Sequence, residues 1–247
     1  MSLSEINIRE RKFHNELHSS GKARSQNKFY KALHSLNEDF INLLKIKTKS
    51  AEVLDYGCGA GNFAKEISLF QPKKIVAIDI SEEAIKKAKE KLEEGNKKID
   101  YRVDNCENLS LESNSFDVAY GSGILHHLNL KKSLDELNRV LRKNGTIVFA
   151  EPLATNPIIN IYRKFTPNAR SPDEHPFKSE DIKLINSIFK NVEIKYYGFL
   201  TLVFFLFYKS PENSKIFKFL SAIDKIILNT KYLKFLAWSV LIEAKKS

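Results

Sequence analysis

Three glycines alternate with other residues directly after a short apolar run that ends in an acid. The run 53–55 closes on Asp55, Tyr56 follows, and then come Gly57, Gly59 and Gly61. Glycine lets the backbone turn sharply and leaves no Cβ between main chain and ligand. A strand, a glycine turn and a helix in this order bring backbone N–H groups against a nucleotide-like ligand. The acid beside the turn would repel a pyrophosphate but suits a ligand with an ammonium group, and no Gly-Lys-Ser/Thr follows to make a Walker loop.

Two further apolar runs end in polar residues that could hold the same ligand. The run 74–79 ends in Asp79, an acid placed to accept hydrogen bonds from a ribose, and Ile80 follows it. The run 99–103 leads into Asp104, Asn105 and Cys106. Ligands of open α/β sheets bind beyond the carboxyl ends of the strands, so these residues are expected to converge.

Candidate proton acceptors follow two later strand-like runs. His126 and His127 come after the fourth run and Glu151 after the fifth, while His175 lies in a Pro-rich segment, where it either serves as a base or anchors its loop. Histidine titrates near neutral pH, as a general base should. His14 could reach the site if an N-terminal helix covers it. No set of Asp, Glu, His and Cys has the spacing of metal ligands, so the sequence predicts no metal.

Alternating strand-like and helix-like segments must position these residues. Helices are expected over 62–70, over 82–92 with Ser81 as its N-cap, over 137–144 closing on Gly145, over 158–164, and from a cap at Ser179 to Phe189. Strands are expected over 53–55, 74–79, 99–103, 114–120, 146–150, 192–197 and 238–244.

This succession of motifs resembles the class I S-adenosylmethionine-dependent methyltransferases, in particular the ubiquinone- and menaquinone-type group. The resemblance covers about residues 50 to 152, and Tyr56 departs from it where the family usually has an aliphatic residue. It implies an α/β, Rossmann-like, seven-stranded, mostly parallel sheet with helices on both faces, the last two strands antiparallel. It implies S-adenosyl-L-methionine as cofactor, with adenine near Asp104, and these cofactor-binding residues: Asp55, Gly57, Gly59, Gly61, Asp79, Ile80, Asp104, Asn105, Cys106 and Gly121.

The two ends of the chain are additions to this core. Residues 1–50 are expected to form an N-terminal helical cap, with a break at Gly21 and buried positions such as Phe13 and Leu17. Residues 51–247 form the methyltransferase domain, with a core at 51–152, a Pro-rich substrate loop at 152–178 and a helical insertion at about 198–237.

The insertion is rich in apolar residues. Its first part, 199–208, is too short to span a bilayer, which needs about 20 residues. A helix should follow, with apolar residues from Ile216 to Leu228 on one side and Lys215, Lys218 and Lys225 among its polar positions. The insertion could pack on the sheet, form a homodimer, or contact lipid or a greasy substrate.

Charge is unevenly distributed along the 247 residues. The net charge is +10, and it arises from residues 1–50, with 10 basic and 5 acidic residues, and residues 209–247, with 8 and 3. Basic flanks suit anionic lipids, an acidic small molecule or nucleic acid, or simply solubility. The two cysteines, Cys58 and Cys106, predict no disulfide framework, and no secretory signal is visible, which favours a cytoplasmic protein that could associate with a membrane surface.

The sequence therefore predicts an enzyme that moves a methyl group from S-adenosylmethionine to O, N or C of a small acceptor, apolar or lipid-like in character. An RNA-modifying methyltransferase that uses the basic flanks is one alternative, although no RNA-binding module is recognisable. A cofactor-binding scaffold without catalysis is another.

Overall fold

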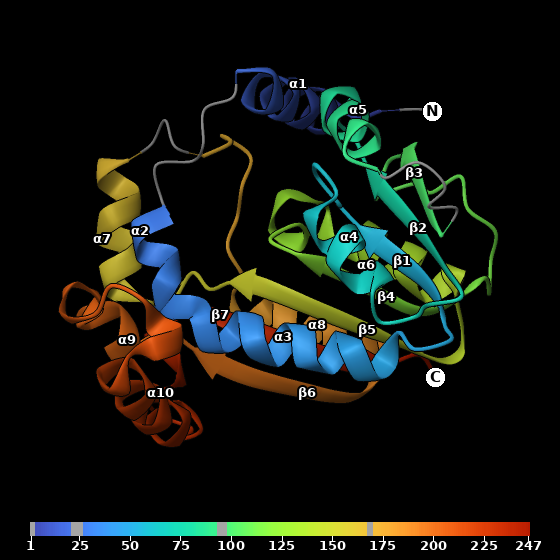
Figure 1. The fold of residues 1–247 in the computed structure, drawn as a ribbon. Helices are drawn as coiled ribbons and strands as arrows, with labels where there is room; N and C mark the ends of the chain where they lie inside the picture. The colour runs from blue at the N-terminus through green and yellow to red at the C-terminus, as the bar shows by residue number, and fades with distance from the viewer. Residues whose placement is uncertain (1–2, 21–26, 93–97, 167–169) are drawn as a thin grey trace.

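The computed structural model describes residues 3–20, 27–92, 98–166 and 170–247, and for residues 27 and 28 only the backbone. A seven-stranded sheet in the order β3-β2-β1-β4-β5-β7-β6 forms its centre (Figure 1). The strands β1 to β5 are parallel, and β7 runs antiparallel to both β5 and β6. The strands are β1 (Glu52–Tyr56), β2 (Lys74–Asp79), β3 (Ile99–Val103), β4 (Phe116–Ser122), β5 (Leu141–Pro152), β6 (Lys190–Tyr197) and β7 (Ser239–Lys245).

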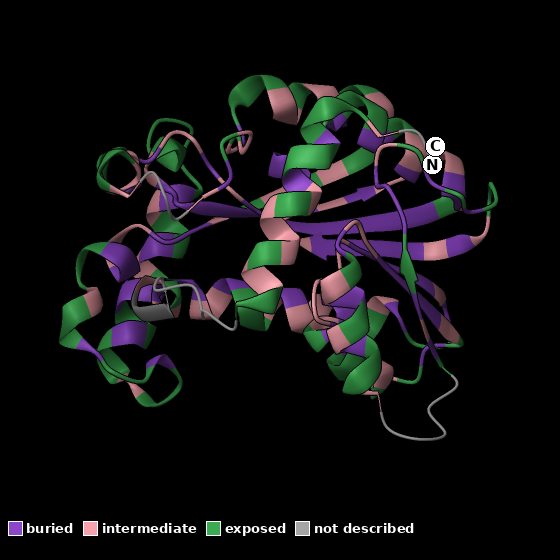
Figure 2. Cartoon of the chain, turned by 90° about the horizontal axis from the view of Figure 1, so that it is seen from above, coloured by how far each residue is buried: buried purple, intermediate pink, exposed green. Residues whose placement is uncertain are grey.

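Helices cover both faces of this sheet, so its central strands are buried (Figure 2). One face packs against α3 (His34–Lys47), α4 (Asn62–Ser68) and α5 (Glu82–Glu90). The other packs against α6 (Leu130–Val140) and α8 (Ser179–Ile188). The strand order reverses between β1 and β4, which is where sheets of this kind bind their ligands. The predicted fold class is confirmed.

One predicted cap is confirmed, and two predicted helix ends are wrong. Ser81 accepts a hydrogen bond from the Ala84 N–H and caps α5. The helix expected over 158–164 is α7 (Pro157–Phe165), which Asn156 caps. The helix expected over 137–144 is the last part of α6, which ends at Val140, because Leu141 already pairs with Phe116 of β4. Sheet pairing overrides helix propensity there. Ser179 is the first residue of α8 rather than its cap, which is Lys178.

The N-terminal segment crosses the molecule at the carboxyl ends of the parallel strands. Helix α1 (Glu5–Ser19) packs against α5, and α2 (Asn27–Tyr30) and η1 (Lys31–Leu33) lead into α3 (Figure 1). The break expected at Gly21 lies outside the described residues. The buried residues of α1 are polar, Asn7 and Glu10, because this helix covers a cavity rather than the apolar core.

The insertion between β6 and β7 is helical, as predicted. It comprises α9 (Leu200–Val203), η4 (Phe205–Phe207), η5 (Pro211–Asn213), α10 (Lys215–Leu228) and η6 (Lys234–Leu236). The buried carboxylate of Asp224 on α10 accepts a 2.7 Å hydrogen bond from the Leu200 N–H and a 2.9 Å bond from the Thr201 hydroxyl, which fastens α9 to α10. None of the described helices has the length and apolar character needed to cross a membrane.

Candidate functional site

The glycine turn after β1 forms the floor of a cavity. Gly57 and Gly59 have positive φ angles of 77° and 51°, in the region that favours glycine. A Cβ on Gly57 would come within 2.5 Å of the Ile124 side chain, whereas a Cβ on Gly59 would make only an ordinary contact, 3.9 Å from the His18 ring. The turn therefore needs glycine at position 57 for packing, and glycine at position 59 leaves room beside the backbone.

Asp79 holds this turn in place from the end of β2. Its carboxylate accepts a 2.8 Å hydrogen bond from the Gly59 N–H and a 2.9 Å bond from the Ser81 N–H. Both oxygens retain further lone pairs, and Asp79 lines the cavity, so it can still accept hydrogen bonds from ligand hydroxyls.

The cavity has a volume of about 340 Å³ and an acidic character. Two carboxylates, Glu10 and Asp79, line it. Three imidazoles also line it, those of His14, His18 and His127, and there is no lysine or arginine among the described lining residues. Such a lining suits a cationic ligand better than a phosphate-bearing one. Of the predicted cofactor residues, these line it: Gly57, Gly59, Asp79, Ile80, Asn105 and Cys106.

The remaining predicted cofactor residues lie behind the cavity wall. Asp104 is buried and accepts hydrogen bonds from the Asn105 N–H and from Ser110, so it shapes the loop that presents Asn105. A Cβ on Gly61 would overlap the Tyr101 ring, and one on Gly121 would overlap Phe149, which makes both glycines packing positions.

Asp55 is fully enclosed beneath the glycine turn. Burial raises the pKa of Asp55 to about 7, partly offset by the nearby Tyr120 hydroxyl, and its Oδ2 atom has no hydrogen-bond partner among the described residues. Asp55 does not line the cavity, so in this structure it lies behind the turn and not against the ligand space. Tyr56, the departure from the family pattern, is also fully buried, and its hydroxyl donates to the Cys106 carbonyl.

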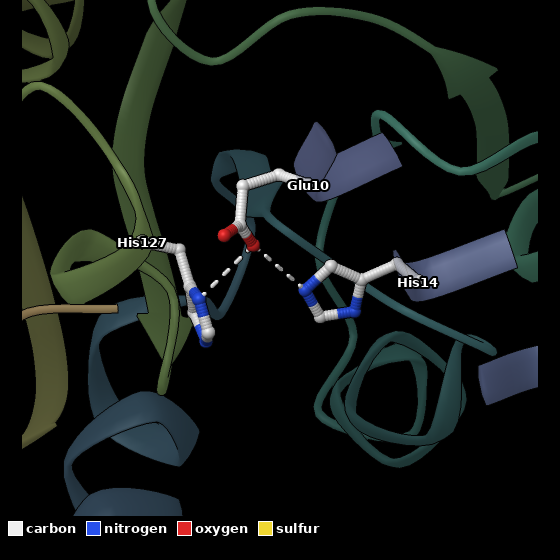
Figure 3. Close-up of side chains that lie close together, drawn as sticks. All are labelled: Glu10, His14 and His127. Atoms are coloured by element: carbon white, nitrogen blue, oxygen red, sulfur yellow. Dashed lines mark ion pairs between the residues drawn. The ribbon is translucent and has the colours of Figure 1, made fainter. Parts of the chain in front are cut away.

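Helix α1 closes the cavity through a buried carboxylate between two imidazoles. The Glu10 Oε2 atom lies 3.2 Å from His127 Nδ1 and 3.4 Å from His14 Nε2 (Figure 3). Burial favours the neutral carboxyl, but the imidazoles and the Ser171 hydroxyl outweigh it and lower the pKa of Glu10. Asn105 adds a 3.3 Å bond to the Asn7 side chain. The helix is therefore tied to the residues that line the cavity.

A second cavity of about 300 Å³ meets the first at Gly123, which lines both. We call it the acceptor cavity. About half of its lining residues are apolar or aromatic, and these include Tyr30, Ile159, Tyr162 and Trp238. Cationic and acidic side chains also line it: Arg163, Arg170, Glu174 and Glu151.

His126 and Glu151 form a buried pair in the wall of the acceptor cavity. His126 Nδ1 lies 2.7 Å from Glu151 Oε2, and the other carboxylate oxygen accepts bonds from the Ile124 and Leu125 N–H groups at 3.1 and 2.9 Å. Burial raises the pKa of Glu151 to about 7, against the lowering effect of these backbone bonds. The carboxylate fixes the orientation of the imidazole, which is the arrangement a general base requires.

The other two predicted bases lie elsewhere. His127 is buried on the cofactor side, where burial lowers its pKa. His175 is exposed and lines neither cavity, and its backbone N–H donates a 2.8 Å bond to the His126 carbonyl, which anchors its loop beside His126. Of the two roles considered for His175, this position favours the loop anchor.

The fold brings together side chains that the spacing along the chain does not suggest. Ligand-capable atoms of Glu10, His14 and His127, and those of His126, His127 and Glu174, lie within 4.8 Å of one another. The absence of a metal remains a prediction. Sequence reasoning missed Glu10 and Asn7, which read as polar surface positions of α1, and Arg163, which lies on a short helix whose packing no pattern reveals.

Comparison with known proteins agrees with this architecture. Residues 54–149 match the family described as "Methyltransferase domain". The chain is 34% identical over 115 residues to demethylmenaquinone methyltransferase of Bacteroides fragilis, covering 45% of this chain and 46% of that protein. It is 30% identical over 112 residues to malonyl-[acyl-carrier protein] O-methyltransferase of Legionella pneumophila, covering 44% and 39%. The match thus spans less than half the length of these relatives.

A solved phosphoethanolamine N-methyltransferase 2 of Haemonchus contortus superposes with a TM-score of 0.69 at 14% identity, covering 99% of this chain and 60% of that one. At that identity the likeness concerns the fold alone. The structural similarity covers nearly the whole chain, whereas the sequence match is limited to residues 54–149. Residues 54–149 thus match the methyltransferase domain model, and the chain as a whole has the fold of solved S-adenosylmethionine-dependent methyltransferases.

Proposed function

We propose that this protein transfers a methyl group from S-adenosylmethionine to a small, apolar or lipid-like acceptor. The lining of the first cavity carries this proposal: a glycine cradle, a carboxylate at the end of β2, and acids and imidazoles, with no lysine or arginine among the lining residues that the structure describes. S-adenosylmethionine carries a sulfonium and an ammonium, so the acidic lining suits it. The similarity to demethylmenaquinone methyltransferase, which is named for a quinone acceptor, supports an apolar acceptor.

Methyl transfer from a sulfonium requires mainly that the protein position the two reactants. Bound S-adenosylmethionine supplies an activated methyl group, and the protein must hold the acceptor atom in line with it and exclude water. Gly123 is where the two cavities meet, and its lack of a side chain leaves a path between them. Helix α1 covers the cofactor side, where its buried Glu10 and Asn7 line the cavity.

His126 is the residue we assign to proton removal from an acceptor hydroxyl or amine. With Nδ1–H donated to Glu151, its Nε2 atom is the one that accepts a proton. Glu151 then stabilises the imidazolium. General-base catalysis is worth about 10²–10⁴ in rate, and this sets the expected effect of removing the imidazole.

The proposal is tested by following S-adenosylhomocysteine formation by mass spectrometry, with S-adenosylmethionine and a bacterial lipid extract as the acceptor source. We expect turnover and an extract component whose mass increases by one methyl group. We expect His126→Ala to lower turnover by about 10²-fold or more while S-adenosylhomocysteine still binds.

His175→Ala is the matched control, because His175 is a nearby histidine that lines neither cavity. It should keep turnover near that of the wild type. Cofactor binding without turnover on lipids, quinols or RNA would instead indicate a scaffold, and methylation of RNA alone would overturn the small-molecule acceptor.

A further inference from the structure

Large apolar side chains are exposed on the helices next to the acceptor cavity. Leu206 and Phe207 on η4 are 77% and 68% exposed, Phe219 on α10 is 65% exposed, and Phe165 at the end of α7 is 82% exposed. Monomeric proteins rarely leave contiguous apolar surface of this kind uncovered unless it binds something. We therefore expect this apolar surface to bind a partner.

Helix α10 has two apolar stripes. Phe217, Leu220 and Leu228 are buried against the rest of the chain, as a core-facing stripe should be. Ile216, Phe219 and Ile226 repeat at the same helical spacing but face solvent. The expectation that α10 has a single apolar side is thus wrong. One apolar stripe packs against the rest of the chain, and the other is exposed to solvent.

Lysines border the exposed stripe. Each residue of the exposed stripe is directly preceded in the sequence by an exposed lysine of α10. These lysines are Lys215, Lys218 and Lys225. Across the insertion six lysines are exposed, while its two acids are the exposed Glu212 and the buried Asp224. An apolar stripe edged by cations is complementary to an anionic lipid surface, where headgroups meet the lysines and acyl chains meet the aromatics.

The apolar surface extends from the insertion to α7. The Phe29 ring lies 4.8 Å from the Phe205 ring of η4 and 5.0 Å from the Tyr162 ring of α7, so the two elements pack against a common residue. Figure 1 shows α7, α9 and α10 at the same end of the molecule. Residues 153–170 contain no acid, so the basic character continues across α7.

Helix α7 connects this surface to the acceptor cavity. Its inner side lines the cavity through Ile159 and Tyr162, and its outer side exposes Ile158, Ile161 and Phe165. One helix is therefore both the wall of the cavity and part of the apolar exterior. A bilayer on the outer side of α7 would therefore lie next to one wall of the acceptor cavity.

We propose that the exposed faces of α7, η4 and α10 bind the surface of an anionic lipid bilayer and set the acceptor cavity against it. We call these faces the lipid-binding surface. Delivery of the acceptor rests on the proposed function, but lipid binding itself does not require cofactor or catalysis. An experiment can therefore disprove lipid binding without disproving the proposed methyl transfer, and the reverse.

The test is co-sedimentation of the full chain with vesicles of phosphatidylcholine that contain phosphatidylglycerol, without cofactor. We expect pelleting with these vesicles, weak pelleting with phosphatidylcholine alone, and loss in high salt. The double variant Phe207→Ser/Phe219→Ser should reduce vesicle affinity at least about tenfold. Lys215→Glu/Lys218→Glu should reduce it for anionic vesicles only.

Leu69→Ser is the matched control, because Leu69 is 75% exposed but follows α4, on the cofactor half of the sheet. It should pellet as the wild type does, and all variants should keep S-adenosylhomocysteine binding and the wild-type melting temperature. Equal pelleting of the double variant and wild type would overturn the proposal. So would a wild-type dimer in light scattering that becomes monomeric in the double variant and ignores vesicles.

Discussion

Two adjacent histidines contact each other but have different acid partners. His126 and His127 lie on η2 (Leu125–His127), and their ring centroids are 4.1 Å apart. His126 pairs with Glu151 in the acceptor cavity, and His127 lies against Glu10 in the first cavity. The sequence placed both residues after the fourth strand, but it could not assign them to cavities, since that depends on the partners that β5 and α1 supply.

Asp55 makes stability depend on pH in the ligand-free protein. Its pKa rises from 3.8 to about 7 on folding, because burial penalises the carboxylate. The folded state thus binds the proton more tightly, and stability present below pH ~4 is lost as pH rises toward 7. We expect Asp55→Asn to flatten this slope and to gain up to about 4 kcal/mol over the wild type above pH 7, at ~1.4 kcal/mol per pKa unit.

Urea unfolding between pH 4 and pH 8 measures this slope. Glu151, whose pKa is also about 7, should leave a residual slope in the variant. Asp135→Asn, at an exposed pair with Lys131, is the control and should follow the wild-type curve. An Asp55→Asn curve parallel to that of the wild type would show that burial does not perturb this carboxyl.

At the scale of elements, the strands and the residues at their ends were predictable, whereas the covering helix was not. Parallel strands have their carboxyl ends at one edge of the sheet. Residues that follow two such strands in the sequence, such as Asp79 and Asn105, are therefore predicted to lie close together, and both line the first cavity. Helix α1 shows no such pattern, because its buried residues are polar. Its position depends on contacts with distant segments, such as the Arg9–Asp173 pair at 2.8 Å.

Glu10 is the residue on which the closed position of α1 depends most. We expect Glu10→Ala to weaken S-adenosylhomocysteine binding about tenfold, ~1.4 kcal/mol, because His14 and His127 lose their shared carboxylate. Hydrogen exchange of residues 5–19 should accelerate, while the sheet keeps its protection.

Glu16→Ala is the control for this change, since Glu16 lies on the same helix but is exposed. It should leave both affinity and exchange unchanged. If Glu10→Ala bound the ligand as the wild type does and α1 exchanged at the same rate, the helix would not be a functional cover.

At the scale of the whole molecule, half of the positive excess lies in residues 209–247, which include the exposed apolar helix α10. The sequence indicated basic flanks and a greasy insertion, and left packing, dimer and lipid contact open. The structure divides the insertion into a packed half, held by Asp224, and an exposed half bordered by lysines. This division depends on which helix face meets the sheet, and composition carries no information about that.

The central claim is that the cavity over the glycine turn binds S-adenosylmethionine, and isothermal titration with S-adenosylhomocysteine tests it most directly. We predict one site per chain in the wild type. Gly59→Arg should abolish binding without unfolding the domain, because position 59 opens into the cavity and an arginine would fill it and add positive charge. No binding by the wild type, or equal binding by Gly59→Arg, would contradict the account.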